Sequence, residues 1–451
     1  MLYQFFFFLI RVVVSVFFRR IDMVGVEHIP ASGPVIFAAN HPNALMDGFI
    51  IMAKCGRSPL HFMADAKLWK YPGMRVFAEG IGAVPVYIRK NPAVPINNET
   101  AFKRLYEVLD GGGCVGIFPE GVSHTDTQLV SFKTGTARIA LSASDRGPRP
   151  ITIVPCGLTY LHRHRFRSQA LLEFGEPIVI DDEWLAAYRT DEDDATRGLT
   201  DHLQTVIGAA TLTAPDWKTL RFVHAARRIY KPRGAWLTPA DYVELSRRFV
   251  DRYQQVAQRP EVIKMRAGVE NYQSRLDMLG IKDYQLRKPL TFGEACRKVL
   301  WRSFVMLVLL PFAIPGAILH MPVAWIAASV GSRFSYDQDD EATLKVIVVV
   351  LLLPLVYLAI AIVVGMLFGL WWGVVIGLAL PLSFFASLKI IEEETNLFTS
   401  VVGILRLVRF RQEVEELRQT RAQLAREIRA IADRHADPDV PRLFTRDDFA
   451  S

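Results

Sequence analysis

Cysteine is scarce in this chain of 451 residues, which contains four: Cys55, Cys114, Cys156 and Cys296. They are widely spaced and form no CxxC pair, which argues against a zinc site and against a disulfide framework. We therefore expect free thiols in a reducing compartment. A GxSxG elbow is also missing, so the serine and histidine of "GVSHTD" do not indicate a serine hydrolase.

Charge is absent from one long stretch, Val346 to Leu388, which runs for 43 residues. This length is enough for two membrane spans of about 20 residues each. A second apolar block, Ser303 to Val330, contains several prolines and predicts either a kinked span or a re-entrant hairpin. Lys and Arg residues flank the blocks on both sides, so the positive-inside rule predicts two cytoplasmic flanks. An even number of crossings is then required, which favours the hairpin.

Hydrophobic residues make up 51% of the chain, and the net charge is +7. This balance predicts an integral membrane protein that works beside anionic phospholipid, and the location of the apolar blocks disfavours nucleic acid as a partner. The opening run, "MLYQFFFFLIRVVVSVFFRR", is interrupted by Arg11 and is short for a span, and its other charges, Arg19 and Arg20, come last, unlike those of a signal peptide. We expect an interfacial helix over residues 1–22. A buried first helix of the globular domain is the alternative.

Short β-rich runs alternate with helix-like stretches between residues 23 and 215. The runs are "PVIFAAN", "FAEGIGAVPVYI", "GCVGIFPEG" and "PITIVPCGLTY", and "AFKRLYEVLD" and "TARIALSAS" lie between them. This alternation predicts an α/β domain: a mixed, largely parallel sheet flanked by helices, with functional loops at the strand ends. Three segments should follow: a helical accessory segment (216–302), a membrane region (303–390), and a charged C-terminal helix and tail (391–451). That last helix could be solvated, or could pair with a partner helix in a homo-oligomer.

The stretch "NHPNALMD" directly follows the apolar run "PVIFAA" and contains His41 and Asp47. On a regular helix the two would lie on different faces, so a direct contact requires His41 in the strand-to-helix loop and Asp47 in the first helical turns. Pro42 favours this arrangement, because it keeps His41 out of the α region and is tolerated at a helix start. With Asp47 on one ring nitrogen, the other could take a proton from a hydroxyl. Such a pair also arises by chance, so alone it indicates no function.

Three further stretches extend this pattern in chain order. They are "GAVPVYIR", "FPEGVSHTD" followed by "FKTG", and "VPCGLTY". Together with "NHPNALMD" they resemble the four motif blocks of the glycerolphosphate acyltransferase family, over roughly residues 23–180. The family commonly has four residues between the histidine and the aspartate, and this chain has five. In that spacing, in its helical extension and in its membrane block, the chain is similar to the branch that uses glycerol 3-phosphate or dihydroxyacetone phosphate.

The resemblance implies roles for the charged residues of these blocks. His41 would be the general base on the acceptor hydroxyl, and Asp47 would orient it. Arg89 would bind the acceptor phosphate through a bidentate fork, and Lys133 would add a point charge. Acyl-CoA or acyl-carrier protein would be the donor, and neither a cofactor nor a metal is implied. The alternative is that Arg89 and Lys133 are ordinary surface charges with no role in binding.

Glu120, Gly121 and Gly135 would shape the adjoining loops and bind substrate, since backbone N–H groups there can face an anion. Glu120 could instead be a turn or cap residue between Pro119 and Gly121. Two alternatives for the whole chain stay open. One is a lysophosphatidate acyltransferase, which acylates an already acylated glycerophosphate. The other is a non-catalytic lipid-binding scaffold in the membrane, against which the intact motif residues argue.

Overall fold

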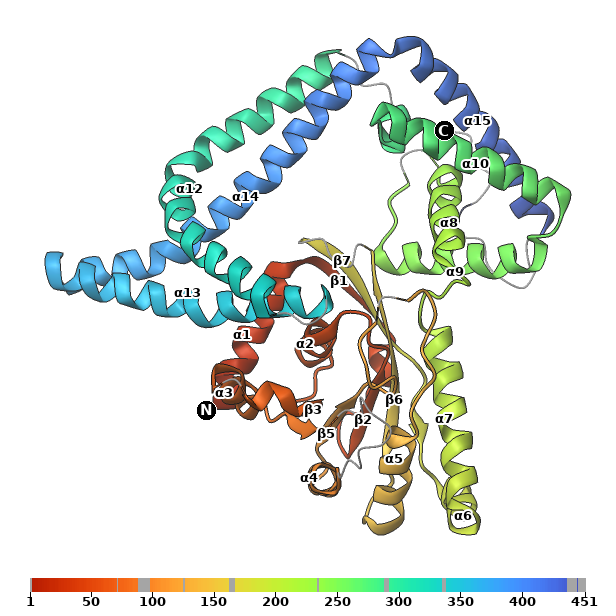
Figure 1. The fold of residues 1–451 in the computed structure, drawn as a ribbon, viewed down its shortest axis with the longest axis vertical. Helices are drawn as coiled ribbons and strands as arrows, with labels where there is room; N and C mark the ends of the chain where they lie inside the picture. Colours follow the sequence, from red (N-terminus) through yellow and green to blue (C-terminus); the bar gives the residue numbers. More distant parts are fainter. Residues whose placement is uncertain are drawn as a thin grey trace. The chain divides into compact units, whose positions relative to one another are not determined.

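A computed structural model describes residues 2–70, 72–87, 98–124, 126–161, 167–232, 235–287, 292–334, 338–435 and 444 (Figure 1). The chain divides into two compact units. One comprises Met1–Trp217 and Leu237–Arg247, and the other Lys218–Trp236 and Arg248–Ser451. The first unit contains the sheet, and the second is helical.

The first unit is built on an eight-stranded sheet with the order β1-β7-β6-β2-β5-β3-β4, and β8 pairs with β6. Strand β2 pairs in parallel with β5 and β6, β3 with β4 and β5, and β1 with β7, whereas β6 is antiparallel to β7 and β8. The predicted mixed, largely parallel sheet is therefore confirmed. The strands are β1 (Phe18–Val24), β2 (Val35–Ala39), β3 (Leu60–Asp65), β4 (Val84–Val86), β5 (Cys114–Ile117), β6 (Thr152–Tyr160), β7 (Ser168–Phe174) and β8 (Ile178–Val179).

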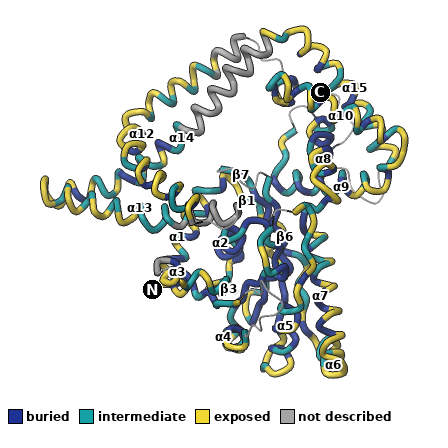
Figure 2. Tube along the Cα trace, in the orientation of Figure 1, coloured by how far each residue is buried: buried dark blue, intermediate teal, exposed yellow. Residues whose placement is uncertain are grey.

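Helices cover this sheet, and its central strands are buried (Figure 2). Every residue of β2 is buried, as expected for a parallel strand covered on both faces. Its Ile36 belongs to a core cluster that includes Leu105 of α4, Ile139 of α5 and Leu203 of α7. The helices of this unit after the first are α2 (Ala44–Lys54), α3 (Pro72–Gly80), α4 (Glu99–Asp110), α5 (Gly135–Arg146), α6 (Asp182–Thr190) and α7 (Glu192–Ala209).

The first helix, α1 (Leu2–Phe17), has two apolar faces. Phe6, Ile10 and Val14 are buried, and the ring of Phe6 meets that of Phe77 at 5.3 Å between centroids. The opposite face exposes large side chains at helical spacing. The buried face agrees with the prediction of a helix of the globular domain, and the contact of the exposed apolar face with a membrane interface stays a prediction. The exposed side chains are Leu2, Phe5, Phe8 and Val12.

Two predicted elements were wrong in their bounds. Helix α1 ends at Phe17, and residues 18–22, which we expected to complete it, begin strand β1 because they pair with β7. The Arg167 side chain donates to the carbonyls of Ser15 and Val16, which have no intrahelical donor at the end of α1. In "FAEGIGAVPVYI", residues 77–80 belong to α3, and of the described residues only Val84–Val86 form a strand.

In the second unit, the charged last helix packs against helices of the same chain. Its apolar side chains Val414, Leu417, Leu424 and Ile428 are buried, and it contacts α10 and α11. The partner helix considered for this segment is therefore present within the chain. These helices are α10 (Pro260–Leu279), α11 (Asp283–Arg287) and α15 (Arg411–Arg434); they are preceded by α8 (Trp217–Tyr230) and by α9 (Pro239–Val256), whose residues are divided between the two units.

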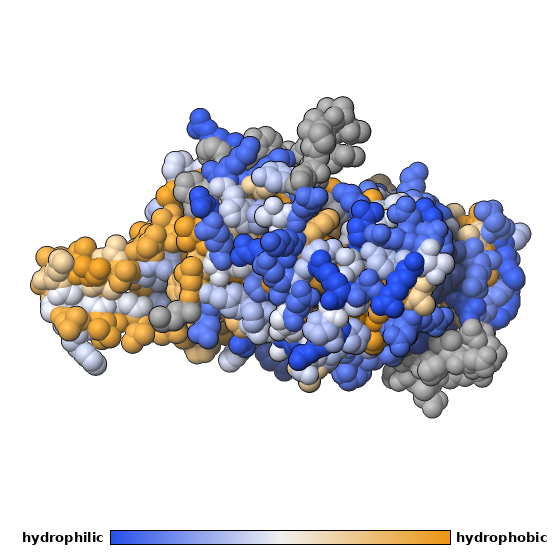
Figure 3. All heavy atoms as spheres, turned by 90° about the horizontal axis from the view of Figure 1, so that it is seen from below, coloured by the Kyte–Doolittle hydropathy of each residue, from blue (hydrophilic) through white to orange (hydrophobic). Residues whose placement is uncertain are grey.

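Three helices in the described part of this unit are long and apolar enough to cross a membrane: α12 (Phe292–Phe334), α13 (Gln338–Phe368) and α14 (Leu370–Arg409). Helix α12 is one continuous helix with three internal prolines, and it is bent (Figure 1). Over Ser303 to Val330 the structure has one bent helix, and the choice between a kinked span and a re-entrant pass stays a prediction. Helices α13 and α14 form a hairpin at Gly369, and their surface is hydrophobic (orange, at the left of Figure 3).

Candidate active site

The loop that carries His41 is fastened to the end of the sheet by Asn40. The Asn40 amide donates to the Leu158 carbonyl at 3.0 Å and accepts the Leu158 N–H at 2.7 Å. Since Ala39 is the last β2 residue paired with β6, this side chain extends the ladder beyond the strand. His41 therefore leaves the carboxyl end of a buried strand in a fixed direction, at the edge where α/β proteins bind ligands.

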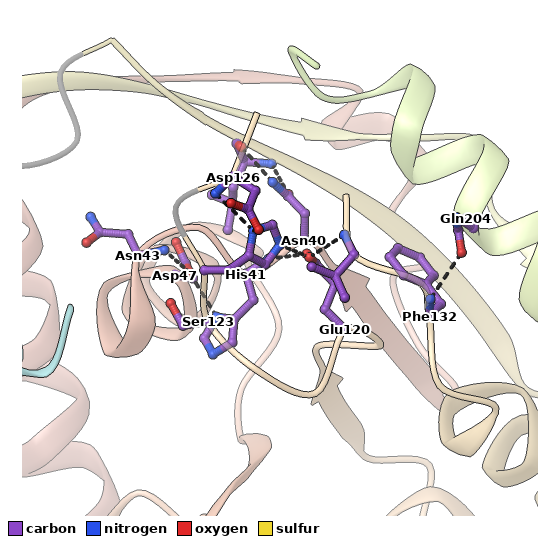
Figure 4. A network of polar contacts seen from close by, with 12 residues as sticks. Asn40, His41, Asn43, Asp47, Glu120, Ser123, Asp126, Phe132 and Gln204 are labelled. Carbon is purple, nitrogen blue, oxygen red and sulfur yellow. Dashed lines mark hydrogen bonds and ion pairs between the residues drawn. The ribbon is translucent and has the colours of Figure 1, made fainter. Parts of the chain in front are cut away.

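His41 and Asp47 are in direct contact (Figure 4). Nδ1 of His41 lies 2.9 Å from Oδ2 of Asp47, which is in the first turn of α2 and is completely buried. The same oxygen accepts the backbone N–H of Asn43 at 2.7 Å. This is the arrangement the sequence required for contact: histidine in the loop, aspartate at the start of the helix.

The second ring nitrogen of His41 is available for chemistry. An ionised carboxylate only accepts hydrogen bonds, so Nδ1 carries the proton toward Asp47, and Nε2 of the neutral ring has a free lone pair. Among the described residues, Nε2 has no hydrogen-bond partner. The ring stacks on Phe118 at 3.9 Å between centroids, and the side chain is 18% exposed. A nitrogen held in this way can take a proton from a hydroxyl.

Glu120 holds the backbone of His41. Its buried carboxylate accepts the His41 N–H at 2.8 Å and the Val130 N–H at 3.2 Å, and it also contacts Nε2 of His124. The side chain is completely buried, so no side of it is open to a substrate. These contacts agree with the predicted role of Glu120 in shaping the loop, and its contact with substrate stays a prediction.

Ser123 and His124 strengthen the same connection between the two loops. Ser123 Oγ accepts the N–H of Ala44, a residue with a positive φ of 43°, and the His124 N–H donates to the His41 carbonyl at 3.2 Å. Both residues thus serve the backbone around His41, which agrees with the missing hydrolase elbow. The sequence alone does not indicate this role for them, because the two loops are 79 residues apart in the chain.

Gly121 and Lys133 lie against one another next to this loop. Gly121 has a φ of +70°, and a Cβ there would lie 2.6 Å from the Lys133 Nζ. The Lys133 backbone is anchored by its N–H to the Pro119 carbonyl at 2.8 Å, and its side chain is exposed. In the described part of the chain the ammonium forms no ion pair. It is therefore a cation available to an anionic ligand close to the His41 loop.

For Gly135 and Arg89, the described part of the structure gives no contact that supports the predicted substrate binding. Gly135 is the first residue of α5, and a Cβ there would meet open space, so no close approach requires glycine. Arg89 lies outside the described residues. The binding roles of both residues stay predictions.

Cysteine provides no nucleophile among the described residues. Cys55, Cys114 and Cys156 are buried free thiols, as the sequence predicted. Burial raises the pKa of Cys55 to about 11 and raises the pKa of the other two. These thiols are protonated near neutral pH and are correspondingly inert.

Two family models match the chain. One, described as "Acyltransferase", matches residues 20–159, and the other, "Glycerol-3-phosphate acyltransferase 2 C-terminal domain", matches residues 222–440. The glycerol-3-phosphate O-acyltransferase 2 of Saccharomyces cerevisiae is 31% identical over 387 residues, which are 78% of this chain and 52% of that protein. The O-acyltransferase 1 of the same yeast is 32% identical over 259 residues, or 56% of this chain and 34% of that protein.

The chain thus spans about half the length of the first of these relatives and about a third of the second. Among solved structures, the crystal structure of the 1-acyl-sn-glycerophosphate acyltransferase PlsC from Thermotoga maritima matches with a TM-score of 0.31 at 23% identity. That match covers 45% of this chain and 79% of the other.

Proposed function

This chain belongs to the glycerolphosphate acyltransferase family, and on that premise we propose that it transfers a fatty acyl group from a thioester to a hydroxyl of a glycerol-phosphate acceptor. The single observation that carries the proposal is the His41–Asp47 pair with its open Nε2. Nε2 removes the hydroxyl proton as the acceptor oxygen attacks the thioester carbonyl. The tetrahedral intermediate expels the thiolate, which takes the proton from His41. The products are an ester and a free thiol.

Glycerol 3-phosphate is the acceptor that the relatives favour. Both yeast relatives carry that substrate in their names, and the second family model extends the likeness far beyond the residues around His41. We assign the acceptor phosphate to Arg89 and to Lys133, whose ammonium forms no ion pair within the described residues. The donor would be acyl-CoA or acyl-carrier protein, both reactive enough to need no acyl-enzyme. The described thiols are buried and protonated, which is consistent with a reaction that has no cysteine acyl-enzyme.

The packing of the last helix supports a definite membrane topology. Helix α15 follows the apolar helices, yet it packs on α10 and α11, which precede them. Arg421 Nε lies 2.9 Å from Oδ1 of Asp283 in a nearly buried ion pair, and Arg275 pairs with Glu416 at 2.9 Å. Helices packed in this way must lie on the same side of a membrane, so the number of crossings between them is even.

Two crossings then belong to α13 and α14. Their apolar windows of 21 residues each would measure about 31 Å, close to the thickness of a bilayer core. The bent α12 would enter the membrane and return without crossing. We place both flanks in the cytoplasm, where the thioester is, with the exposed face of α1 at the anionic surface. We do not extend the proposal to a homo-oligomer, since the apolar face of α15 is occupied within the chain.

An acyl-transfer assay tests the activity. The purified chain is offered a labelled acyl thioester with glycerol 3-phosphate, dihydroxyacetone phosphate or lysophosphatidate in parallel. Transfer to glycerol 3-phosphate is expected in wild type, and it should fall by about two to four orders of magnitude in His41→Ala. The control is His202→Ala, which replaces an exposed histidine on α7 and should transfer the acyl group as wild type does. Transfer only to lysophosphatidate would move the chain to the alternative acceptor. Undiminished transfer by a folded His41→Ala variant would overturn the mechanism.

Cysteine labelling tests the topology. Single cysteines replace the exposed Glu107 on α4, Glu413 on α15 and Leu370 at the α13–α14 turn of a cysteine-free variant, and an impermeant maleimide is applied to intact cells. Only the cysteine at position 370 should react from outside. If the cysteine at 413 reacts and that at 107 does not, the number of crossings is odd, and α12 is a span.

A further inference from the structure

Tyr160, the last residue of β6, reaches the catalytic pair from the far side of Asp47. Its hydroxyl donates to Oδ1 of Asp47 at 2.5 Å, although the two residues are 113 positions apart in the chain. The ring is half-buried and lies beside Phe18 of β1, at 5.7 Å between centroids. Tyr160 thus approaches Asp47 from the sheet, whereas His41 and Asn43 approach it from the loop.

The three donors to Asp47 are divided unequally between its two oxygens. Oδ2 accepts the Nδ1–H of His41 and the N–H of Asn43, while Oδ1 accepts the Tyr160 hydroxyl. A buried carboxylate oxygen without a hydrogen bond is destabilising, so the Tyr160 hydroxyl supplies the partner that Oδ1 requires. The carboxylate turns about its Cβ–Cγ bond, so the Tyr160 donor on Oδ1 adds a restraint on its plane to that of the two donors on Oδ2. The plane of the carboxylate in turn sets the direction in which the His41 ring points.

The end of β6 also holds the other member of the pair. Two residues before Tyr160, the backbone of Leu158 binds both ends of the Asn40 amide, and Asn40 directly precedes His41. The last residues of β6 therefore contact both Asn40, which precedes His41, and the carboxylate of Asp47. Neither contact needs a substrate, so both are present before binding.

We infer that Tyr160 is a positioning residue, which orients Asp47 and through it keeps the proton of the neutral His41 ring on Nδ1. This inference rests on the proposed function for its catalytic consequence, but the geometry of the pair does not depend on turnover. Loss of the hydroxyl should therefore change the state of the His41 ring even where no reaction is measured.

The test is Tyr160→Phe, which removes the hydroxyl and keeps the ring. Its matched control is Tyr188→Phe, because the Tyr188 hydroxyl also donates to a carboxylate, that of Glu192 at 3.0 Å, but does so on the surface at α6 and α7. The kcat of Tyr160→Phe is expected to fall by about ten- to a hundred-fold, the range for a charged hydrogen bond, with the KM of both substrates unchanged. Tyr188→Phe should match wild type.

A spectroscopic measurement separates this inference from the proposed function. Imidazole nitrogen NMR on histidine-labelled protein reports which ring nitrogen of His41 carries the proton. Tyr160→Phe should show a larger share of the Nε2–H form than wild type or Tyr188→Phe at the same pH. If wild type has no transferase activity but the tautomer shifts, the proposed function falls and the positioning role stands. If the tautomer is unchanged in a folded Tyr160→Phe variant, the positioning role is refuted.

Discussion

Replacing Asp47 by asparagine removes the charge behind His41 while the hydrogen bonds around it can persist. The oxygen of the new amide must take the Oδ2 position, because the Asn43 N–H that points there at 2.7 Å is a backbone donor and cannot reverse. The amide NH2 then faces the Tyr160 hydroxyl, which can rotate and accept. His41 still donates through Nδ1 to an oxygen, so the proton stays on the nitrogen where the reaction requires it.

The expected loss follows from that geometry. A hydrogen bond to a charged group contributes about 1.5–3 kcal/mol and a neutral one about 0.5–1.5, so the charge accounts for about 1–1.5 kcal/mol, or roughly tenfold in kcat. In serine proteases the corresponding change costs about 10⁴, because there the amide selects the wrong tautomer. Asp47→Asn should therefore be far more active than His41→Ala, for which a loss of about 10² to 10⁴ is expected.

The assay compares initial rates of acyl transfer at saturating substrates for wild type, Asp47→Asn, His41→Ala and Asp145→Asn. Asp145 pairs with Arg189 on the surface, so its variant controls for the same chemical change away from the site. A rate for Asp47→Asn as low as that of His41→Ala would show that the amide does not take the expected orientation. A rate equal to that of wild type would show that the charge of Asp47 contributes nothing.

Two further predictions concern the loop beside the site and the buried thiols. Gly121→Ala should lower the free energy of unfolding in urea by about 1–2 kcal/mol, because the φ of +70° is unfavourable for alanine. It should also raise the KM of the phosphorylated acceptor more than that of the thioester, because the new Cβ displaces the Lys133 side chain. Gly198→Ala on α7, where a Cβ meets open space, is its control, and equal unfolding curves for the two variants would contradict the reasoning. Burial raises the pKa of the thiols of Cys55, Cys114 and Cys156. Iodoacetamide near pH 8 should therefore modify these thiols only after denaturation. Rapid labelling of the native protein would show that they are not buried.

The sequence by itself determined those features that depend on short stretches of chain. Continuous apolar runs such as "VIFAA" predicted buried parallel strands, and β2 is buried at every residue. The long uncharged stretch predicted apolar helices, and α13 and α14 formed there. Pro42 and the spacing of His41 and Asp47 predicted a histidine in a loop and an aspartate at a helix start, because both requirements are local.

Tertiary packing decided the features that depend on residues far apart in the chain. Residues 18–22 were predicted to complete an apolar helix, and they form part of a strand because they pair with β7. Glu120 looked like a turn residue or a substrate ligand until the backbone of His41 was found on its buried carboxylate. The local pattern of α15 left open what would cover its apolar face, and α10 of the same chain covers it.

The hydrogen bond from Tyr160 to Asp47 is the clearest example of a contact that the sequence does not predict. The block "VPCGLTY" was recognisable as a strand end, because it belongs to a short β-rich run. No local pattern, however, records that the end of β6 lies opposite the first turn of α2, because that proximity is produced by the order of strands in the sheet. Residue chemistry and spacing determined which groups are present, and the pairing of β6 beside β2 decided which of them meet.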